Sequence, residues 1–149
     1  MLSQTVEYAL RAMIHLASLT PDSSVNSKAI ADHTQVPKGY LSKILRDLVV
    51  AELITSQRGP NGGFTLARTP AQISMLDVVN AVDQIDRITK CPLGNPEHVN
   101  LCPLHRRLDD ALAMIEQELC RTSLAEILAT NTKNSTCTSL MNPPVSRKK

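Results

Sequence analysis

Aromatic residues are scarce in this chain of 149 residues, which has one Phe, two Tyr and no Trp. A hydrophobic core must therefore be aliphatic, and with 42% hydrophobic residues the chain can form one compact domain with its own core. No apolar run approaches the length of a membrane span, and Glu7 and Arg11 interrupt the first apolar segment, unlike a signal peptide. We therefore expect a cytoplasmic protein without a membrane segment.

Paired metal-binding cysteines and enzyme motifs are also missing. The spacing of the four cysteines contains no CxxC pair, which excludes a zinc ribbon. The run from Gly59 to Gly63 lacks the lysine of a phosphate-binding loop, and no paired carboxylates or nucleophile–base pair occur at catalytic spacing. We therefore do not expect an enzyme, and a metalloprotein that does not bind DNA is a remote alternative.

The formal net charge of +2 is unevenly distributed. Residues 1–70 hold seven Lys and Arg against five Asp and Glu, whereas residues 71–146 hold six against nine. The N-terminal half is thus slightly basic, which is compatible with a nucleic-acid partner but does not establish one.

Two copies of the tripeptide Cys-Pro-Leu bracket a short loop, at residues 91–93 and 102–104. In a reducing cytosol such cysteines serve as ligands more often than as disulfides, and thiolate and imidazole suit iron and zinc. Cys91 and Cys102 are therefore candidate metal or cofactor ligands, with His105 and His98 as further candidates. These four residues would also make a tetrahedral zinc site. Cys120 is assigned to helix packing and Cys137 to a free thiol.

Hydrophobic periodicity predicts helices over residues 4–19, 27–34, 38–51, 75–82, about 103–121, and a last one ending near 130. In the first helix, Glu7, Arg11 and His15 fall on the polar face, and Glu7 and Arg11 are spaced for a surface ion pair. Residues 27–34 and 38–51, joined by a short turn, form a helix-turn-helix pattern.

A glycine-rich turn at residues 58–63 separates two short predicted strands, 53–57 and 64–66. This pattern predicts a two-stranded wing after the helix-turn-helix. Arg58 beside the glycine turn is placed to enter a narrow minor groove of DNA, although a solvated surface arginine is the alternative.

The predicted fold class is mainly α with a small β wing. We expect a winged helix-turn-helix domain over residues 1–83, a cofactor-binding loop over 84–102, and a disordered tail over 131–149. Between loop and tail, residues 103–130 form a long helix and a short terminal helix. An apolar stripe along the long helix predicts a homodimer seam; it consists of Leu104, Leu108, Ala111, Leu112, Ile115 and Leu119.

Four segments together resemble the Rrf-two (Rrf2) family of bacterial winged-helix regulators: residues 2–10, 36–41, 58–64 and 77–83. The resemblance extends to about Thr130. Members of this family sense iron–sulphur status, iron or nitric oxide. The resemblance implies a transcriptional regulator that responds to one of these signals.

For the cofactor, the resemblance implies an iron–sulphur cluster bound by cysteines of this loop, completed by a histidine or by an acidic residue from the partner's first helix. Cys91 and Cys102 match the first and third family cysteines, and His105 completes a Cys-x-x-His element. The middle cysteine is absent, which favours [2Fe-2S] over [4Fe-4S], completed by His105, His98 or Glu7 of the other subunit. Structural zinc, a thiol switch between Cys91 and Cys102, or no cofactor are the alternatives.

For DNA, the resemblance implies a homodimer on an inverted-repeat operator in double-stranded DNA. Residues in the major groove would be Tyr40, Ser42 and Lys43, with Arg58 in the minor groove. Lys38 and Arg46 would contact phosphates, and Lys28 in the preceding helix belongs to the same predicted surface.

Overall fold

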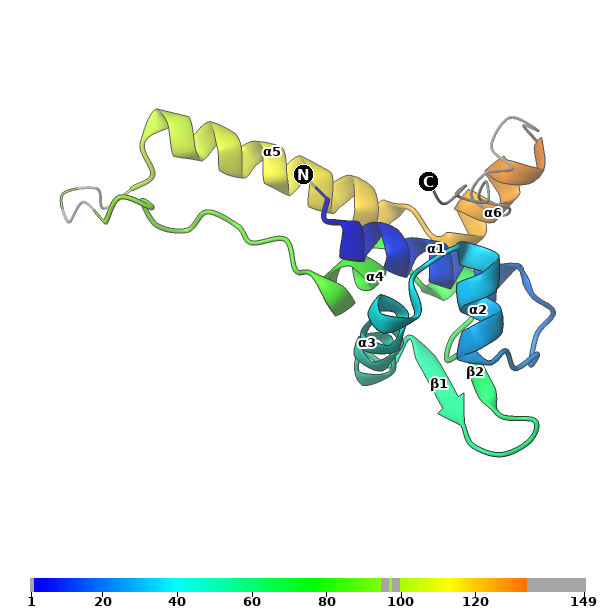
Figure 1. Cartoon of the computed structure of the whole chain (residues 1–149). Coiled ribbons are helices and arrows are strands. Elements are labelled where there is room, and N and C mark those ends of the chain that lie inside the picture. Colours follow the sequence, from blue (N-terminus) through cyan, green and yellow to red (C-terminus); the bar gives the residue numbers. More distant parts are fainter. Residues whose placement is uncertain (1, 95–96, 98–99, 134–149) are drawn as a thin grey trace, which may run out of the picture.

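The computed structural model describes residues 2–94, 97 and 100–133 (Figure 1). The helices are α1 (Gln4–Ser18), α2 (Ser27–Thr34), α3 (Lys38–Val50), the 3-10 helix η1 (Pro70–Gln72), α4 (Met75–Val82), α5 (Pro103–Arg121) and α6 (Leu124–Lys133). The strands are β1 (Ile54–Gln57) and β2 (Gly63–Leu66). A mainly helical fold with a small β wing is thus confirmed.

Helix α1 forms the centre of the core. Ser3 caps it, because its side-chain oxygen accepts a hydrogen bond from the backbone N–H of Val6. Its buried aliphatic side chains pack against α2, α3, α4 and α6. The core is aliphatic, as the composition requires; its largest members with under 2% exposure include Met13, Ile30, Leu41, Ile44, Leu45, Leu48, Leu53, Ile54, Ile73 and Leu124.

The predicted helix-turn-helix is present. Asn26 caps α2 by accepting a 2.8 Å hydrogen bond from the N–H of Ala29, and Gln35 ends it in a left-handed conformation (φ 57°). Buried Val36 anchors the turn before α3 begins at Lys38. Because α3 buries one aliphatic face, its opposite face is left for a ligand.

The wing is an antiparallel pair in which Ile54 lies opposite Leu66 and Gln57 opposite Gly63. Phe64 ties it to the segment before α2: its N–H donates to the Val25 carbonyl at 2.8 Å, and the Val25 N–H donates back. A Cβ atom at position 63 would lie 2.5 Å from the Val25 carbonyl carbon, so only glycine allows this approach. The wing is therefore held to the helix-turn-helix.

Helices α4 and α6 start side by side. Ser74 and Asp77 form a capping box at the start of α4, and the Met75 N–H donates to the Thr122 carbonyl at 2.8 Å. Leu124, at the start of α6, is fully buried. Helix α6 continues to Lys133, three residues beyond the end expected near residue 130. The rest of the expected tail, with Cys137, lies outside the described residues.

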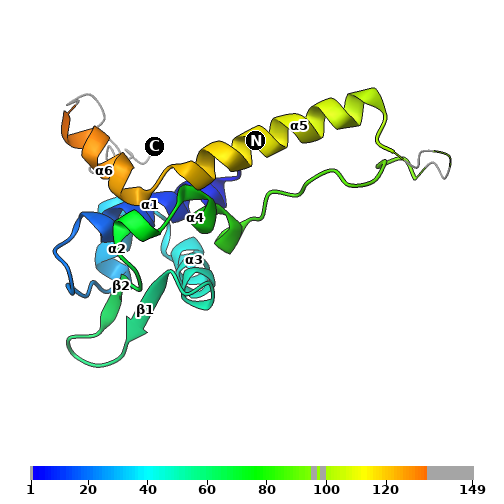
Figure 2. The ribbon, with the colours of Figure 1, turned by 180° about the vertical axis from the view of Figure 1, so that it is seen from behind.

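Helix α5 projects from the helical domain, and residues 83–94 run outward alongside it without helix or strand (Figures 1 and 2). None of its side chains is buried. Cys120 is exposed, so its assignment to helix packing was wrong: the apolar stripe with Leu119 faces the core, and Cys120 is one position further round the helix. Within the described ranges, no helix is long and apolar enough to cross a membrane.

His15 corrects the prediction for α1. It is 8% exposed and its ring stacks on His33 of α2, with ring centroids 3.9 Å apart. The position was placed on the polar face because histidine is polar and lies four residues after Arg11. In the fold, α2 covers this side of α1, and the aromatic ring packs there instead of contacting solvent.

Candidate nucleic-acid interface and cysteine loop

The uncovered face of α3 carries most of the residues predicted to bind DNA. Tyr40 is 57% exposed, although it is one of only three Phe and Tyr residues in the chain. Lys38, Ser42, Lys43 and Arg46 are exposed on the same helix. An exposed, cationic helix face after a helix-turn-helix turn has the geometry of a major-groove recognition helix.

The N-terminal ends of α2 and α3 meet at a surface pocket of about 170 Å³. It is lined by Ser27, Lys28, Lys38, Leu41 and Ser42, so three residues predicted separately for DNA binding lie around one hollow. Helix N-termini carry partial positive charge and free N–H groups. Two lysines beside such ends form a setting that favours a phosphate oxygen.

Lys43 and Arg46 share one carboxylate on their own helix. The Lys43 Nζ lies 3.6 Å from Asp47 Oδ2, and the Arg46 Nε lies 3.9 Å from Asp47 Oδ1. Both cations remain well exposed, at 64% and 73% of their side-chain surface. Exposed pairs of this kind are weak, so both side chains are free to turn toward an approaching polyanion.

The wing lies beside the recognition helix. A groove of about 330 Å³ between them is lined by Ser27, Ser42, Leu45, Arg46, Val49, Ser56 and Phe64. Arg58 is exposed in the turn at the wing's tip, where Gly59 adopts a φ of +111°. The wing therefore carries Arg58 away from the helical domain, as the minor-groove prediction requires.

Tyr40 is also in contact with α1. Its ring meets the ring of Tyr8 edge to face, with centroids 6.0 Å apart. The guanidinium of Arg11 lies 6.0 Å from the centroid of Tyr8 and forms a 3.0 Å ion pair with Glu7, which confirms the predicted surface pair. A line of contacts thus runs from Glu7 to the recognition helix.

In the cysteine loop, Cys102 and His105 are brought together. Cys102 precedes α5 as its N-cap residue, with Pro103 in the first turn, and its Sγ lies 3.2 Å from His105 Nδ1. The N-terminal turn of α5 creates this contact because residues three apart lie on the same side of a helix. A thiol and an imidazole at this distance offer two of the donors that iron or zinc prefers.

Cys91 lies at a turn that begins to reverse the chain. The Gly94 N–H donates to the Cys91 carbonyl at 3.0 Å, and Gly94 has a left-handed φ of +64°. Among the residues that the structure describes, no three His, Cys, Asp or Glu side chains are grouped as metal ligands. Cys91 is thus not grouped with Cys102 and His105 in the described part of the chain, and His98 lies outside the described residues.

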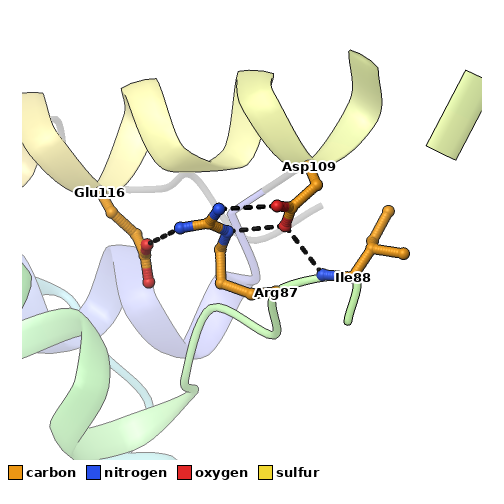
Figure 3. Close-up of polar contacts among 4 residues, drawn as sticks. All are labelled: Arg87, Ile88, Asp109 and Glu116. Atoms are coloured by element: carbon orange, nitrogen blue, oxygen red, sulfur yellow. Dashed lines mark hydrogen bonds and ion pairs between the residues drawn. The ribbon is translucent and has the colours of Figure 1, made fainter. Parts of the chain in front are cut away.

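An arginine cluster fixes the chain before the loop onto α5 (Figure 3). Arg87 donates to both carboxylate oxygens of Asp109, from Nε at 2.6 Å and from Nη2 at 2.7 Å, and from Nη1 to Glu116 at 3.1 Å. The Ile88 N–H adds a 2.9 Å bond to Asp109. The Arg87 hydrogen bonds hold the pKa of Asp109 below its usual value, so this carboxylate stays charged.

The Arg87 cluster was not found from the sequence. The only signal was an arginine in an acidic linker followed, about two helical turns apart on α5, by two acids. Such a signal is weak because the partners are 22 and 29 residues away. Only the position of residues 83–94 along α5 brings them together (Figures 1 and 2).

Comparison with known proteins agrees with this geometry. Residues 2–130 match the Rrf2 family model, described as an iron-dependent transcriptional regulator. The chain is 32% identical over 130 residues to the HTH-type transcriptional regulator NsrR of Geobacillus kaustophilus, covering 85% of this chain and 88% of that protein.

Solved structures with the same fold include CymR, the global cysteine regulator of B. subtilis, and IscR of T. potens. CymR matches with a TM-score of 0.73 and 23% identity over 87% of this chain and 97% of CymR. IscR matches with a TM-score of 0.72 and 25% identity over 87% of each chain. The likeness to CymR shows the fold of the described domain.

Proposed function

Because the chain belongs to the Rrf2 family of DNA-binding transcriptional regulators, we propose that it binds an inverted-repeat operator as a homodimer and senses redox state, nitric oxide or iron. Its family consists of regulators and not of enzymes, which confirms the expectation from the missing catalytic motifs. The proposed sensor is an iron–sulphur cluster at the Cys91–Cys102 loop.

The observation that carries the DNA-binding part is the surface shared by α2 and α3. Lys28, Lys38 and Ser42 surround one small pocket at two helix N-termini, and exposed Tyr40 lies on the same helix as two of them. In this proposal a phosphate lies in the pocket and sets the register, while Tyr40, Ser42 and Lys43 contact base edges. Arg58 at the wing tip enters the adjacent minor groove.

The cofactor part is supported by the donors at the start of α5. Cys102 and His105 would hold the cluster together with Cys91, and the donor set of thiolate and imidazole fits a [2Fe-2S] group. In this proposal the fourth donor is His98 or Glu7 of a second subunit, as in the ligand sets that the family resemblance implies. A cluster bound there supplies a group that reacts with oxidants and nitric oxide.

The homodimer is supported by apolar side chains that α5 leaves uncovered. Leu104 is 64% exposed, Leu108 is 47% exposed, and Ala111 is exposed one turn further along the same edge. Apolar residues spaced three and four apart on a projecting helix have the pattern of a helix–helix seam. A second copy of α5 would cover them.

The contacts around Tyr8 give a route from sensor to DNA within this proposal. If Glu7 turns toward a partner's loop, Arg11 loses its ion pair and is free to leave the Tyr8 ring, which itself contacts the ring of Tyr40. Tyr40 then shifts on the recognition helix. A change at the loop would thereby alter base contacts without unfolding the domain.

In vitro selection from random duplex DNA tests the DNA-binding part. The protein, purified without oxygen, should enrich an inverted repeat whose half-sites lie about one helical turn, or a multiple of it, apart. Tyr40→Ala should weaken sequence discrimination, whereas Lys38→Ala should reduce the salt dependence of binding. Failure to enrich any sequence, with only weak binding to all DNA, would contradict the proposal.

Analysis of iron, acid-labile sulphide and zinc in the same preparation tests the sensor. We expect iron and sulphide in equal amounts, lost in the double variant Cys91→Ala/Cys102→Ala. Cys120→Ala is the matched control, because Cys120 is an exposed cysteine at the far end of α5 and should leave both unchanged. Operator binding that is identical in the double variant and the wild type, in every redox state, would refute a sensing role for the loop.

The alternative keeps the DNA-binding fold and replaces the cluster by structural zinc or by a thiol switch. The 3.2 Å contact between Cys102 and His105 favours it as well, because an adjacent imidazole can stabilise a thiolate. Zinc without iron would support the structural site. No metal, with DNA affinity that changes on reversible oxidation of Cys91 and Cys102, would support the switch.

A further inference from the structure

Residues 83–94, called here the arm, follow the end of α4 and contain the first loop cysteine, Cys91. Figures 1 and 2 show the arm running alongside α5 in the opposite chain direction. It forms no helix or strand in its described part, so no backbone ladder sets its position along α5. Its register must come from side-chain contacts.

The Arg87 cluster supplies such a register. The Arg87 guanidinium donates two hydrogen bonds, of 2.6 and 2.7 Å, to the two carboxylate oxygens of Asp109, in the bidentate geometry typical of arginine and carboxylate (Figure 3). A third hydrogen bond of 3.1 Å goes to Glu116. The Ile88 N–H also donates to Asp109. A backbone N–H and a side chain of the arm thus both donate to the Asp109 carboxylate. A shift of the arm by one residue along α5 would break all of these hydrogen bonds.

The contact between Arg87 and Asp109, called here the clamp, is separated from each of the two cysteines by a similar length of chain. Cys91 follows Ile88 by three residues, which span at most about 10 Å. Cys102 precedes Asp109 by seven residues, which span about 10 Å of helix. Because arm and α5 run in opposite directions, the two paths end at the same level along the helix, where the turn after Cys91 starts to bring the chain back.

We propose that Arg87 and Asp109 are positioning residues for the cysteine site: their clamp sets the register of the arm so that Cys91 lies opposite Cys102. The inference rests on the proposed function only in taking these two cysteines as one functional pair, whether they hold a cluster or form a thiol switch. Neither clamp residue is itself a ligand, since each is held by the other.

The test measures the equilibrium constant for forming a Cys91–Cys102 disulfide in protein that carries no cofactor. The full chain carrying Cys120→Ser and Cys137→Ser is freed of metal with a chelator and equilibrated with reduced and oxidised glutathione. Alkylation and mass spectrometry then give the fraction of the Cys91–Cys102 disulfide and its reduction potential. The ten residues between the two cysteines set the baseline, because the short connection alone keeps the two thiols near each other.

We expect Arg87→Gln to lower the equilibrium constant for the disulfide about tenfold, a change of about 30 mV in potential. The matched control is Arg121→Gln, which removes an exposed arginine of α5 that pairs with Glu118 at 3.7 Å and forms no hydrogen bond or ion pair with residues 83–94. It should leave the potential unchanged. An Arg87→Gln potential equal to that of the wild type would overturn the proposal.

A double-mutant cycle separates positioning from a general loss of stability. If Arg87 and Asp109 act as one clamp, Arg87→Gln should change the disulfide potential little further once Asp109→Asn is present. Additive changes in the potential would overturn the proposal. Iron and sulphide retained alongside an unchanged dithiol potential would refute the clamp and leave the cluster standing. Absence of iron and sulphide from the wild type would refute the cluster, and the dithiol potential would still decide the clamp.

Discussion

Acidification should destabilise this protein through His15. The ring is 8% exposed, stacks on His33 and has a buried Nδ1 without a hydrogen-bond partner among the described residues. Burial, reinforced by the neighbouring His33, lowers the pKa of His15 to about 4 from its usual 6.5. The folded state therefore keeps His15 neutral where the unfolded state binds a proton.

Proton linkage gives the sign and size of this change in the free energy of unfolding. Above about pH 7.5 neither state binds the proton, so stability is at its full value; it then falls as the pH drops through 6.5 toward 4. With these two pKa values, His15 alone should lower the free energy of unfolding by about 2 kcal/mol between pH 7.5 and pH 5. That is a large part of the stability of an ordinary domain.

Urea denaturation followed by circular dichroism at pH 7.5, 6.5, 5.5 and 5.0 measures this effect. His15→Leu should remove about 2 kcal/mol of the wild-type loss, and at pH 7.5 it should leave stability equal or raise it, because a buried unpaired nitrogen is removed. Two protein concentrations separate folding from subunit dissociation. Carboxylates titrate in both proteins, so an equal loss in wild type and His15→Leu would refute the reasoning.

Three further predictions concern the wing and α5. Arg58→Ala should weaken binding of the selected duplex about tenfold and reduce by about one the slope of log affinity against log salt concentration. Arg68→Ala, at an exposed position outside the wing turn, should change neither, and equal losses in the two variants would contradict a groove contact. Leu108→Glu should give a folded monomer in sedimentation velocity, whereas Gln117→Glu, at another exposed position on α5, should remain a dimer. A Leu108→Glu protein that is still a dimer would exclude a dimer interface along the Leu104–Leu108 edge of α5. Gly63→Ala should lower the free energy of unfolding by about 1–3 kcal/mol because its Cβ would meet the Val25 backbone, and an unchanged urea midpoint would exclude that clash.

The elements of the DNA-binding domain could be predicted because their signals are local. Residues 27–34 and 75–82 were expected to be helical and are, since caps and hydrophobic periodicity act within a few turns. The wing followed from a glycine turn between two short β-prone runs. The pairing of Glu7 with Arg11 was predictable for the same reason, being a contact four residues apart within one helix.

The candidate site was predictable only where its parts are adjacent in sequence. Cys102 and His105 come together because they share the first turn of α5, and the donor types indicate metal chemistry. Whether Cys91 meets them depends on how the arm lies along α5, which its own residues do not encode locally. His15 was misplaced for a related reason, because only the position of α2 decides which side of α1 is covered.

The sequence by itself determined the helices, the wing turn, the aliphatic core and the positions of the two loop cysteines along the chain. Tertiary structure alone decided that Lys28, Lys38 and Ser42 surround one pocket, and that Arg87 reaches Asp109 across 22 residues. The physical reason is the range of the interactions. Caps, turns and periodic burial act between near neighbours, whereas an ion pair or a shared pocket exists only after packing has brought distant segments together.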